Sequence, residues 1–348
     1  MNVPIIAFFN NKGGVGKTSL VYHLSWMFAD QGRRVLAADL DPQANLSAAF
    51  LTDDRLEKIW GEEEIPHTVY DAIKPIKDGL GDVAVPEPQL ISRDPNFEPA
   101  EDFQADLFLL PGDLQLSAFE DDLSTQWALC LDKQPRAFRV TSAFWRLLQG
   151  AARKHACELI LVDIGPNLGA INRAALISAD HVVFPLSPDL FSLQGLRNLG
   201  PTLKSWREEW RERRQRNPVD GLELPSGGIH PLGYIILQHN VRLDRPVKAY
   251  ERWASRIPGE YRDSILHQPE ANPPESSAQD PYCLAMLKHF RSLMPMAQDA
   301  RKPIFFLKAA DGAIGAHAQG VQSAYQAFSK MADEIISRIP SLATEERL

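Results

Sequence analysis

One short segment near the start of the chain has the residue types and spacing that suit phosphate binding. Residues 12–18 read K-G-G-V-G-K-T, after an apolar stretch at 3–9 and before an amphipathic stretch at 19–30. The glycines let backbone N–H groups turn toward phosphate oxygens, since a Cβ would obstruct the approach. A helix that begins directly after the loop also points its positive end at the same anion. The segment therefore predicts a phosphate-binding loop rather than a plain glycine turn before a core helix.

The polar residues of this loop suit phosphoryl transfer from a nucleotide. We expect Lys17 to reach the β- and γ-phosphates and the Thr18 hydroxyl to ligate Mg²⁺. A second cation, Lys12, suggests a further device for stabilising charge during phosphoryl transfer. The residues expected to hold the nucleotide are Gly13, Gly14, Val15, Gly16, Lys17, Thr18 and Ser19.

Carboxylates follow two further apolar segments. Asp39 and Asp41 end the stretch that begins at residue 35, and Asp163 follows residues 159–162. In an open parallel sheet, the carboxyl ends of the strands border the ligand crevice, and alternation puts Asp39 and Asp41 on one side of their strand. A carboxylate after so apolar a strand as 159–162 is costly unless it is paired or lies near a metal. Helix caps, strand-end caps or solvated loop acids are the alternative interpretation of these residues.

These motifs resemble those of the deviant Walker A ATPases, the ParA/MinD group, in which the first lysine of the loop is the signature residue. Residues 39–45 read D-L-D-P-Q-A-N, which is similar to the D-x-D-P-Q switch of the group and closest to its chromosome and plasmid partition branch. Residues 159–166 resemble its Walker B strand, with Gly165 in place of the first proline of the usual D-x-P-P. The resemblance covers residues 1 to about 50, 158 to 200 and, more loosely, 230 to the end.

The resemblance implies roles for single residues. Asp41 would position or activate the attacking water, Asp39 would support the Mg²⁺ shell, and Asp163 would bind Mg²⁺ through a water. Lys12 would cross a dimer interface to the γ-phosphate of the partner's nucleotide, which would make dimerisation conditional on ATP. The alternative for Lys12 is a contact with the phosphates of its own site.

Base recognition has a weaker signal. Asn240 stands where the group has a polar residue that contacts adenine, and an Asn amide suits the adenine edge because it donates and accepts hydrogen bonds together. An ordinary turn residue is the alternative. Residues 295–298 are candidates for packing on the other side of the base.

The pattern of strands and helices predicts an α/β fold with a doubly wound, mainly parallel sheet, the P-loop NTPase fold of the deviant Walker A type. We expect a single domain over residues 1–348, with edge insertions at about 52–106, 202–229 and 257–281. The expected strands are 3–9, 35–38, 107–112, 159–162, 179–185 and 232–237. The expected helices are 19–30, 69–73, 143–155, 206–216 and 321–338.

Composition sets limits on the kind of protein. The formal net charge of −8 argues against a surface coated in positive charge, although a local basic patch remains open. The three cysteines form no C-x-x-C pair, so neither a zinc site nor a disulfide framework is indicated. No signal peptide is visible, and no stretch approaches the roughly 20 apolar residues of a membrane span. We expect a cytoplasmic protein, and a C-terminal helix that packs on the core rather than on a membrane.

Basic residues give one candidate surface. On a helix from residue 246 onward, Lys248, Arg252 and Arg256 recur every four residues along one face, which would bind DNA phosphates without reading sequence. A solvated or partner-facing surface is the alternative. The wider basic cluster also contains Arg242, Arg245 and Arg262.

The function predicted from these features is an ATP-hydrolysing molecular switch. It would form a homodimer on ATP, act in DNA, plasmid or cargo partitioning on a surface such as the nucleoid, and be reset by a partner protein that stimulates slow hydrolysis. A metabolic enzyme that uses ATP to phosphorylate or activate a small substrate is an alternative, with the insertions as a lid. An ATP-gated adaptor that binds only proteins is another.

Overall fold

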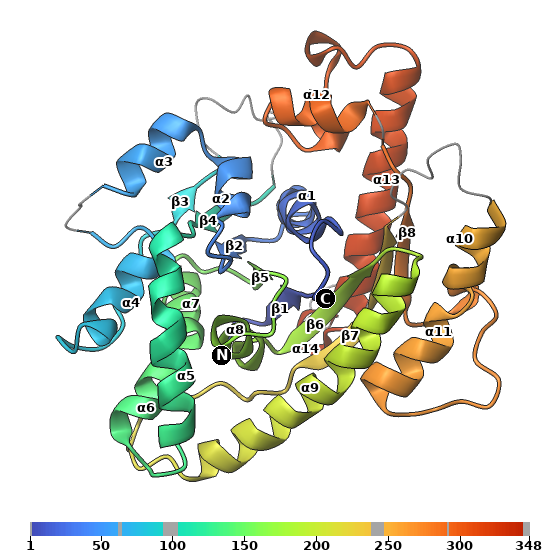
Figure 1. The fold of residues 1–348 in the computed structure, drawn as a ribbon. Helices are drawn as coiled ribbons and strands as arrows, with labels where there is room; N and C mark the ends of the chain where they lie inside the picture. Colours follow the sequence, from blue (N-terminus) through green and yellow to red (C-terminus); the bar gives the residue numbers. More distant parts are fainter. Residues whose placement is uncertain (1, 62–64, 93–103, 238–246, 291, 344–348) are drawn as a thin grey trace. The chain divides into compact units, whose positions relative to one another are not determined.

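A computed structural model describes residues 2–61, 65–92, 104–237, 247–290 and 292–343. Eight strands form a sheet in the order β3-β4-β2-β5-β1-β6-β7-β8 (Figure 1). The pairs β1–β5, β2–β5, β2–β4 and β7–β8 are parallel, and the edge strand β3 is antiparallel to β4. Helices flank this mainly parallel sheet, which confirms the predicted α/β class.

The strand bounds agree closely with the sequence pattern for most of the sheet. They are β1 Ile5–Phe8, β2 Val35–Asp39, β3 Gln89–Leu90, β4 Leu107–Leu110, β5 Leu159–Asp163, β6 His181–Leu186, β7 His230–Leu237 and β8 Cys283–Leu287.

The chain divides into two compact units that interleave in the sequence. The first contains residues 1–9, 28–182 and 203–230, and the second contains residues 10–27, 183–202 and 231–348. The chain passes from one unit to the other within α1 (Lys17–Asp30), β6 and α9 (Leu190–Gln215), and also near residues 9 and 230.

In the first unit, the parallel strands are apolar except for Asp39 and Asp163 at the ends of β2 and β5, because both faces of the sheet are covered. Every residue of β1, β2, β4 and β5 is buried. Helix α7 (Ala143–Lys154) contacts β5, and α8 (Ala170–Ser178) contacts β1. The other helices of this unit are α2 Asn45–Phe50, α3 Asp53–Ile59, α4 Val69–Lys77, α5 Glu120–Leu129 and α6 Pro135–Thr141.

In the described part of the proline-rich segment 52–106, α4 contains the expected helix 69–73, and α3 and the edge strand β3 form as well. Helix α4 begins with a capping box between Thr68 and Asp71, and it ends at Lys77, two residues after Pro75. A capping box satisfies backbone donors at the start of the helix, and Gly79, with a φ of 74°, ends it in a left-handed conformation. The local signals therefore fix both ends of α4.

In the second unit, β7 and β8 pair next to helices from the C-terminal part of the chain. These are α10 Val247–Ala254, α11 Ile257–Glu260, α12 Leu293–Asp299, α13 Ala316–Ser337 and α14 Pro340–Ala343. Helix α13 contacts β8 and buries a stripe that includes Phe328, Met331 and Ile335. The predicted core-packing role of the C-terminal helix is confirmed, although Tyr325 is exposed rather than part of the buried stripe.

One basic residue of the predicted surface cluster lies in the core instead. Arg262 is 3% exposed and donates two hydrogen bonds to Asp280, at 3.0 and 2.8 Å. Asp280 also accepts a hydrogen bond from the hydroxyl of Tyr234 at 2.6 Å. A buried guanidinium needs such a paired carboxylate to offset its lost hydration. Asp280, which Arg262 holds, therefore ties the segment 257–281 to Tyr234 of β7, and the buried Arg262 cannot serve a DNA-binding surface.

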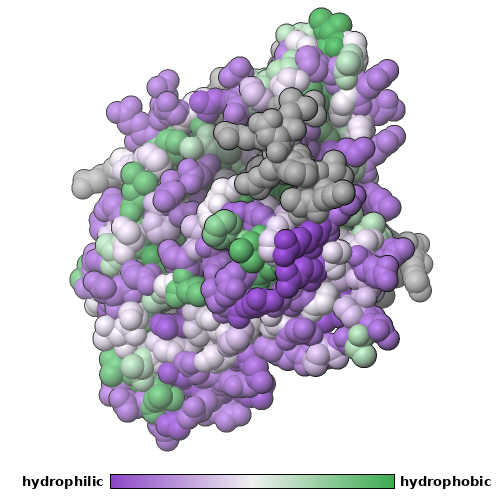
Figure 2. All heavy atoms as spheres, turned by 45° about the vertical axis from the view of Figure 1, so that its right-hand side comes forward, coloured by the Kyte–Doolittle hydropathy of each residue, from purple (hydrophilic) through white to green (hydrophobic). Residues whose placement is uncertain are grey.

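The face in Figure 2 is mostly hydrophilic, with hydrophobic side chains in small scattered groups. Within the described part of the chain, no helix is both long enough and apolar enough to cross a membrane. Cys130, Cys157 and Cys283 are free thiols.

Candidate functional site

The predicted phosphate loop joins β1 to α1. Gly14 and Gly16 have φ angles of 71° and 88°, a backbone region that glycine adopts without strain. Beside Gly13 and Gly14, a Cβ would meet no atom within 4 Å, so the space next to their backbone is open. The N–H of Leu20 bonds to the carbonyl of Gly16 at 3.0 Å and starts the first turn of α1. The loop thus has the open, glycine-lined form that backbone N–H binding of phosphate requires.

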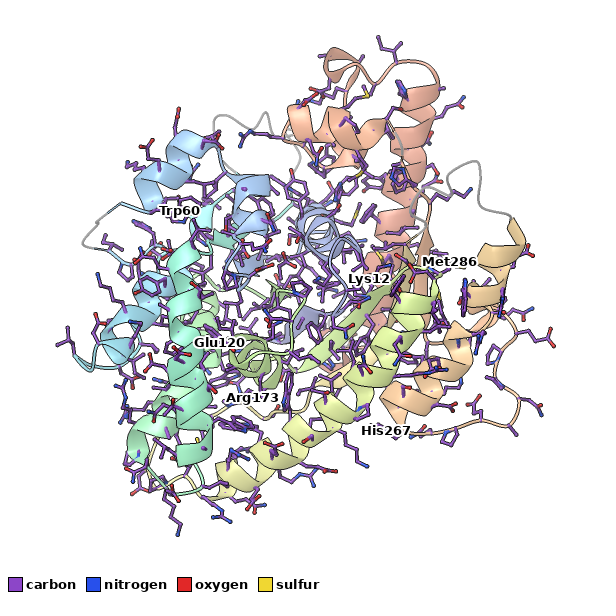
Figure 3. The ribbon with its side chains drawn as sticks, viewed as in Figure 1. Lys12, Trp60, Glu120, Arg173, His267 and Met286 are labelled. Atoms are coloured by element: carbon purple, nitrogen blue, oxygen red, sulfur yellow. The ribbon has the colours of Figure 1, made fainter. Side chains whose placement is uncertain are left out.

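The two lysines of the loop have different surroundings. Lys17 is 7% exposed at the first position of α1. Lys12 is more exposed, and its ammonium lies 2.5 Å from the carboxylate of Asp189, just before α9, and 5.6 Å from the centre of the Phe191 ring. Figure 3 labels Lys12 close to the start of α9. In this state, Lys12 is engaged with the first residues of α9.

Asn10 and Asp189 support this arrangement from the two adjoining loops. The buried amide of Asn10 donates to the carbonyl of Pro185 at 2.7 Å and accepts from the N–H of Lys12 at 2.9 Å. Asp189 also accepts from the N–H of Ser192 at 2.8 Å, in the first turn of α9. The start of the phosphate loop is therefore tied to the end of β6 and to α9.

In the first unit, three carboxylates lie at the carboxyl ends of neighbouring strands. Asp39 and Asp163 are in register across β2 and β5, and both are fully buried. Asp163 is also in register with Phe8 at the end of β1, four residues before the phosphate loop begins at Lys12. Asp41 is 8% exposed in the turn after β2.

Asp39 has a built hydrogen-bonding environment. One carboxylate oxygen accepts from the N–H and the hydroxyl of Ser47, each at 2.8 Å, and the other accepts from the N–H of Asp41 at 3.2 Å. The hydroxyl of Ser47 in turn accepts from the N–H of Gly112 at 2.8 Å. Burial raises the pKa of the Asp39 carboxyl above its usual range, and the hydrogen bonds from Ser47 oppose that shift.

Asp41 begins a tight turn whose backbone is strained at one residue. Its side chain accepts from the N–H of Gln43 at 3.0 Å, and its carbonyl accepts from the N–H of Ala44 at 2.9 Å. Ala44 has a φ of 52°, a left-handed conformation that costs a non-glycine residue about 1 kcal/mol. Strained backbone of this kind gathers at active sites and switch regions.

Gly165 lies directly against Asp41. A Cβ at residue 165 would be 3.3 Å from one carboxylate oxygen of Asp41 and 3.6 Å from the other. The resemblance places a proline here, so the glycine is the departure noted in the sequence. In this chain, the carboxylate of Asp41 lies so close that a side chain at residue 165 would press on it, which accounts for the glycine.

A cavity of about 120 Å³ opens beside the phosphate loop in the second unit. Gly16, Ser19 and His23 line one side, and the other walls come from the end of β7, the segment after β8, α12, the 3-10 turn 304–306 and α13. Its further lining residues are Leu20, Leu237, Leu287, Lys288, His289, Phe290, Met294, Ile304 and Phe328. A small, mainly apolar cavity with a few polar groups suits a planar ring.

His23 holds two walls of this cavity together. Its Nδ1 lies 2.7 Å from the carbonyl of Ser19, and its Nε2 accepts from the N–H of Ile304 at 3.2 Å. These partners assign the proton to Nδ1 of a neutral ring. The ring stacks on Phe328 at 5.1 Å, and burial lowers the pKa of His23 to about 4.

Asp39 and Asp163 in the first unit and Thr18 in the second carry oxygen donors of the type that Mg²⁺ prefers. Among the residues that the structure describes, no three His, Cys, Asp or Glu side chains converge to form a metal cage. Mg²⁺ rarely uses such a cage, because it keeps several waters and binds one or two protein groups together with substrate phosphates. The donor types in each unit therefore suit Mg²⁺ bound together with a nucleotide.

Two predictions of the sequence fall partly outside the described residues. Asn240 lies outside them, and so does the side chain of Lys248 on α10. Arg252 and Arg256 are exposed, with their guanidinium carbons 5.1 and 5.4 Å from the centre of the Trp253 ring. Met294, in the α12 helix that holds residues 295–298, lines the cavity beside the phosphate loop.

A family model described as an AAA domain, AAA_31, matches residues 3–215, more than half of the chain. The chromosome partitioning protein ParA from Caulobacter vibrioides is 27% identical over 200 residues, which are 58% of this chain and 62% of ParA. The chain belongs to the ParA/MinD-type family of P-loop ATPases. It spans less than two thirds of the length of the first curated relatives that it matches.

Solved structures share the fold of this ParA/MinD-type chain over nearly its whole length. Protein DIP2308 from Corynebacterium diphtheriae has a TM-score of 0.68 at 25% identity, covering 97% of this chain and 99% of that one. The cell division ATPase MinD from Pyrococcus furiosus has a TM-score of 0.54 at 19% identity, covering 95% and 98%. At that identity, the likeness to MinD concerns the fold alone.

Several residues that support the site in this ParA/MinD-type chain were missed in the sequence. They are Asn10, Ser47, Gly112, Glu120, Asn172 and Asp189. Each of them forms a hydrogen bond or an ion pair with a residue outside its own local motif, so the local spacing of residues gives no signal for the contact. Only the nearness of Asp189 to the end of an expected strand could have marked it, because the carboxyl ends of parallel strands face the ligand.

Proposed function

We propose that the chain is an ATP-hydrolysing molecular switch that works with Mg²⁺. The observation that supports this best is the set of strand ends. Asp163 is in register with both Asp39 and Phe8, and the glycine loop begins at Lys12, four residues after Phe8. Phosphate-binding backbone and carboxylates thus follow neighbouring parallel strands at their carboxyl ends, where α/β sheets bind ligands.

In this proposal, each residue has a distinct part in the attack of water on the γ-phosphate. The loop N–H groups and Lys17 hold the phosphates, and Thr18, Asp39 and Asp163 hold Mg²⁺ directly or through water. Bound Mg²⁺ would neutralise the charge that develops on the β- and γ-phosphate oxygens. Asp41 orients the attacking water, and Gly165 leaves its carboxylate room to do so.

We further propose that the adenine base enters the cavity lined by Ser19, His23 and Phe290. Its apolar walls would cover the faces of the ring, and Asn240, three residues after Leu237 on that wall, would supply a polar contact to the edge. Residues 295–298 would flank the base through α12.

Lys12 is proposed to make dimerisation depend on ATP. In the single chain, its ammonium is held by Asp189 beside Phe191, whose side chain is 71% exposed. A second chain that presents a triphosphate would attract Lys12 more strongly than one with a diphosphate, because the added charge raises the Coulomb energy. Hydrolysis would then release the partner.

The proposed setting is partitioning of DNA, plasmid or other cargo in the cytoplasm, on a surface such as the nucleoid. The exposed Arg252 on α10 and Arg256, two residues after the end of α10, would contact DNA phosphates together with Lys248. A partner protein would stimulate hydrolysis and reset the switch.

Release of phosphate from ATP by the purified chain, with and without Mg²⁺, tests the proposal. We expect slow turnover in the wild type, loss of ATP binding in Lys17→Ala, and retained binding with hydrolysis lowered about 100-fold or more in Asp41→Ala. The exposed Asp54→Ala is a control that should leave both unchanged. No ATP turnover under any condition would reject the switch and show that the chain does not catalyse ATP hydrolysis. ATP turnover that requires a small phosphoryl acceptor would reject it in favour of a metabolic enzyme.

A further inference from the structure

The start of α8 is held by a carboxylate from a distant part of the chain. Glu120, the first residue of α5, accepts from the N–H of Ala170 at 2.5 Å and from the N–H of Ile171 at 2.9 Å. Gly169 precedes α8 and has no side chain to cap it. Figure 3 labels Glu120 next to this helix. Glu120 therefore supplies both the capping acceptor and the negative charge that a helix N-terminus favours.

The fit between Glu120 and the turn before α8 is tight. A Cβ at residue 169 would be 2.6 Å from one carboxylate oxygen of Glu120, so this carboxylate keeps its place only beside a glycine. The N–H of Gly169 bonds to the side chain of Asn167 at 3.0 Å. Three successive N–H groups, at residues 169, 170 and 171, are thus satisfied by two side chains.

The other end of the same turn is tied to α8 as well. The amide of Asn172, which is 1% exposed, donates to the carbonyl of Gly165 at 2.7 Å and to that of Asn167 at 2.6 Å. Gly165 is the residue that lies against Asp41, and it follows Asp163 by two positions. A displacement of the first turn of α8 would therefore carry Gly165 with it.

We propose that Glu120 is a positioning residue for hydrolysis. By fixing the first turn of α8 it sets the place of the turn 165–169, and through that turn the places of Asp41 and Asp163. This role rests on the proposed function. Glu120 would affect the groups that orient the attacking water and hold the metal. The glycine loop that binds the nucleotide is a separate segment of the sequence.

The variant Glu120→Gln keeps the size of the side chain but replaces one acceptor oxygen with an NH₂ group, which cannot accept a hydrogen bond. In full-length protein with Mg²⁺ and ATP, we expect the single-turnover rate to fall about 10- to 100-fold, as for a small misplacement of catalytic groups. The affinity for ATP should not change. Hydrogen exchange should accelerate at residues 165–171. The exposed Asp121→Asn, on the same helix, is the matched control for loss of charge.

Gly169→Ala is a second variant that displaces the carboxylate from the other side. It should slow hydrolysis in the same way, and the double variant should be no slower than the single ones, because both remove one clamp. Equal rates for Glu120→Gln and Asp121→Asn would overturn the proposal, as would a rate loss explained wholly by a lower melting temperature. A wild type that does not hydrolyse ATP would reject the proposed function instead, while the exchange measurement would still report on the clamp.

Discussion

At the scale of single residues, the motifs predict candidate groups for the chemistry but not the groups that orient them. The structure places Asp39 and Asp163 at strand ends and Asp41 in the turn after β2. Asp39 is held by a hydrogen bond from Ser47, which in turn accepts one from Gly112. These two residues follow Asp39 by 8 and 73 positions in the chain. Such contacts depend on the tertiary fold, and a single sequence carries no pattern for them.

The close packing of Gly112 on Asp39 leads to a prediction. A Cβ at residue 112 would be 3.0 Å from both the carboxyl carbon and the backbone oxygen of Asp39. We expect Gly112→Ala to lower the free energy of unfolding by about 1–3 kcal/mol, as overpacking does. Urea titration measures this change.

Gly81→Ala is the control for this substitution, because a Cβ there would meet no atom within 4 Å. It should be neutral or slightly stabilising, through a less flexible unfolded chain. Equal free energies of unfolding for the two variants would show that the residues around Asp39 can accommodate a Cβ without loss of stability, which would contradict tight packing at Gly112.

At the scale of elements, periodicity predicted most of the strands and the C-terminal helix α13, but it missed the first part of α9 and strand β8. The predicted helix at 206–216 is only the last part of α9, a helix of 26 residues that starts at Leu190. Gly195, Gly200 and Pro201 lie inside it and would weaken a helix prediction from local propensity. Strand β8 was not predicted, since five residues without polar alternation give no strand period.

The link between α1 and the turn 304–306 predicts a dependence of stability on pH. Burial lowers the pKa of His23 from 6.5 in a model peptide to about 4. Between these values the unfolded chain binds a proton that the folded chain does not, so stability falls as the pH falls. An imidazolium would also be unable to accept the hydrogen bond from Ile304.

We therefore expect the wild type to lose about 1–2 kcal/mol more than His23→Gln between pH 7.5 and pH 5. Chemical denaturation at each pH gives the slope of the free energy of unfolding against pH. This slope separates the titration of His23 from any loss of stability that is the same at every pH. His317→Gln, at a half-buried site on α13, should keep the slope of the wild type. If the free energy of unfolding changed equally with pH in the wild type and in His23→Gln, the lowered pKa of His23 would be contradicted.

At the scale of the whole molecule, the family and its fold are established, while assembly and surface binding are proposals. The net charge of −8 makes general attraction to DNA weak, so any binding must come from a local surface. Arg252 and Arg256 are exposed, and both guanidinium groups lie near the ring of Trp253. Sequence spacing grouped them with Arg262, which the fold buries against Asp280.

Reversing the charge of this surface should separate DNA binding from nucleotide chemistry. We expect Arg252→Glu with Arg256→Glu to weaken DNA binding and to reduce the slope of log affinity against log salt by about 1 for each lost phosphate contact. ATP hydrolysis without DNA should stay at the wild-type rate. Arg211→Glu with Arg214→Glu, on exposed positions of α9, makes the same change in charge and should leave DNA binding unchanged. Equal losses in both variants would show a general charge effect instead.

The most direct test of the switch is the mass of the chain in solution, by light scattering, with no nucleotide, ADP or ATP. Asp41→Ala is the protein to use, because slow hydrolysis would preserve the ATP state. We expect a dimer with ATP alone, and a monomer in all three states once Lys12→Ala is added. A mass that does not change with ATP, in a protein shown to bind it, would contradict the switch. A dimer that survives Lys12→Ala would remove that lysine from the interface.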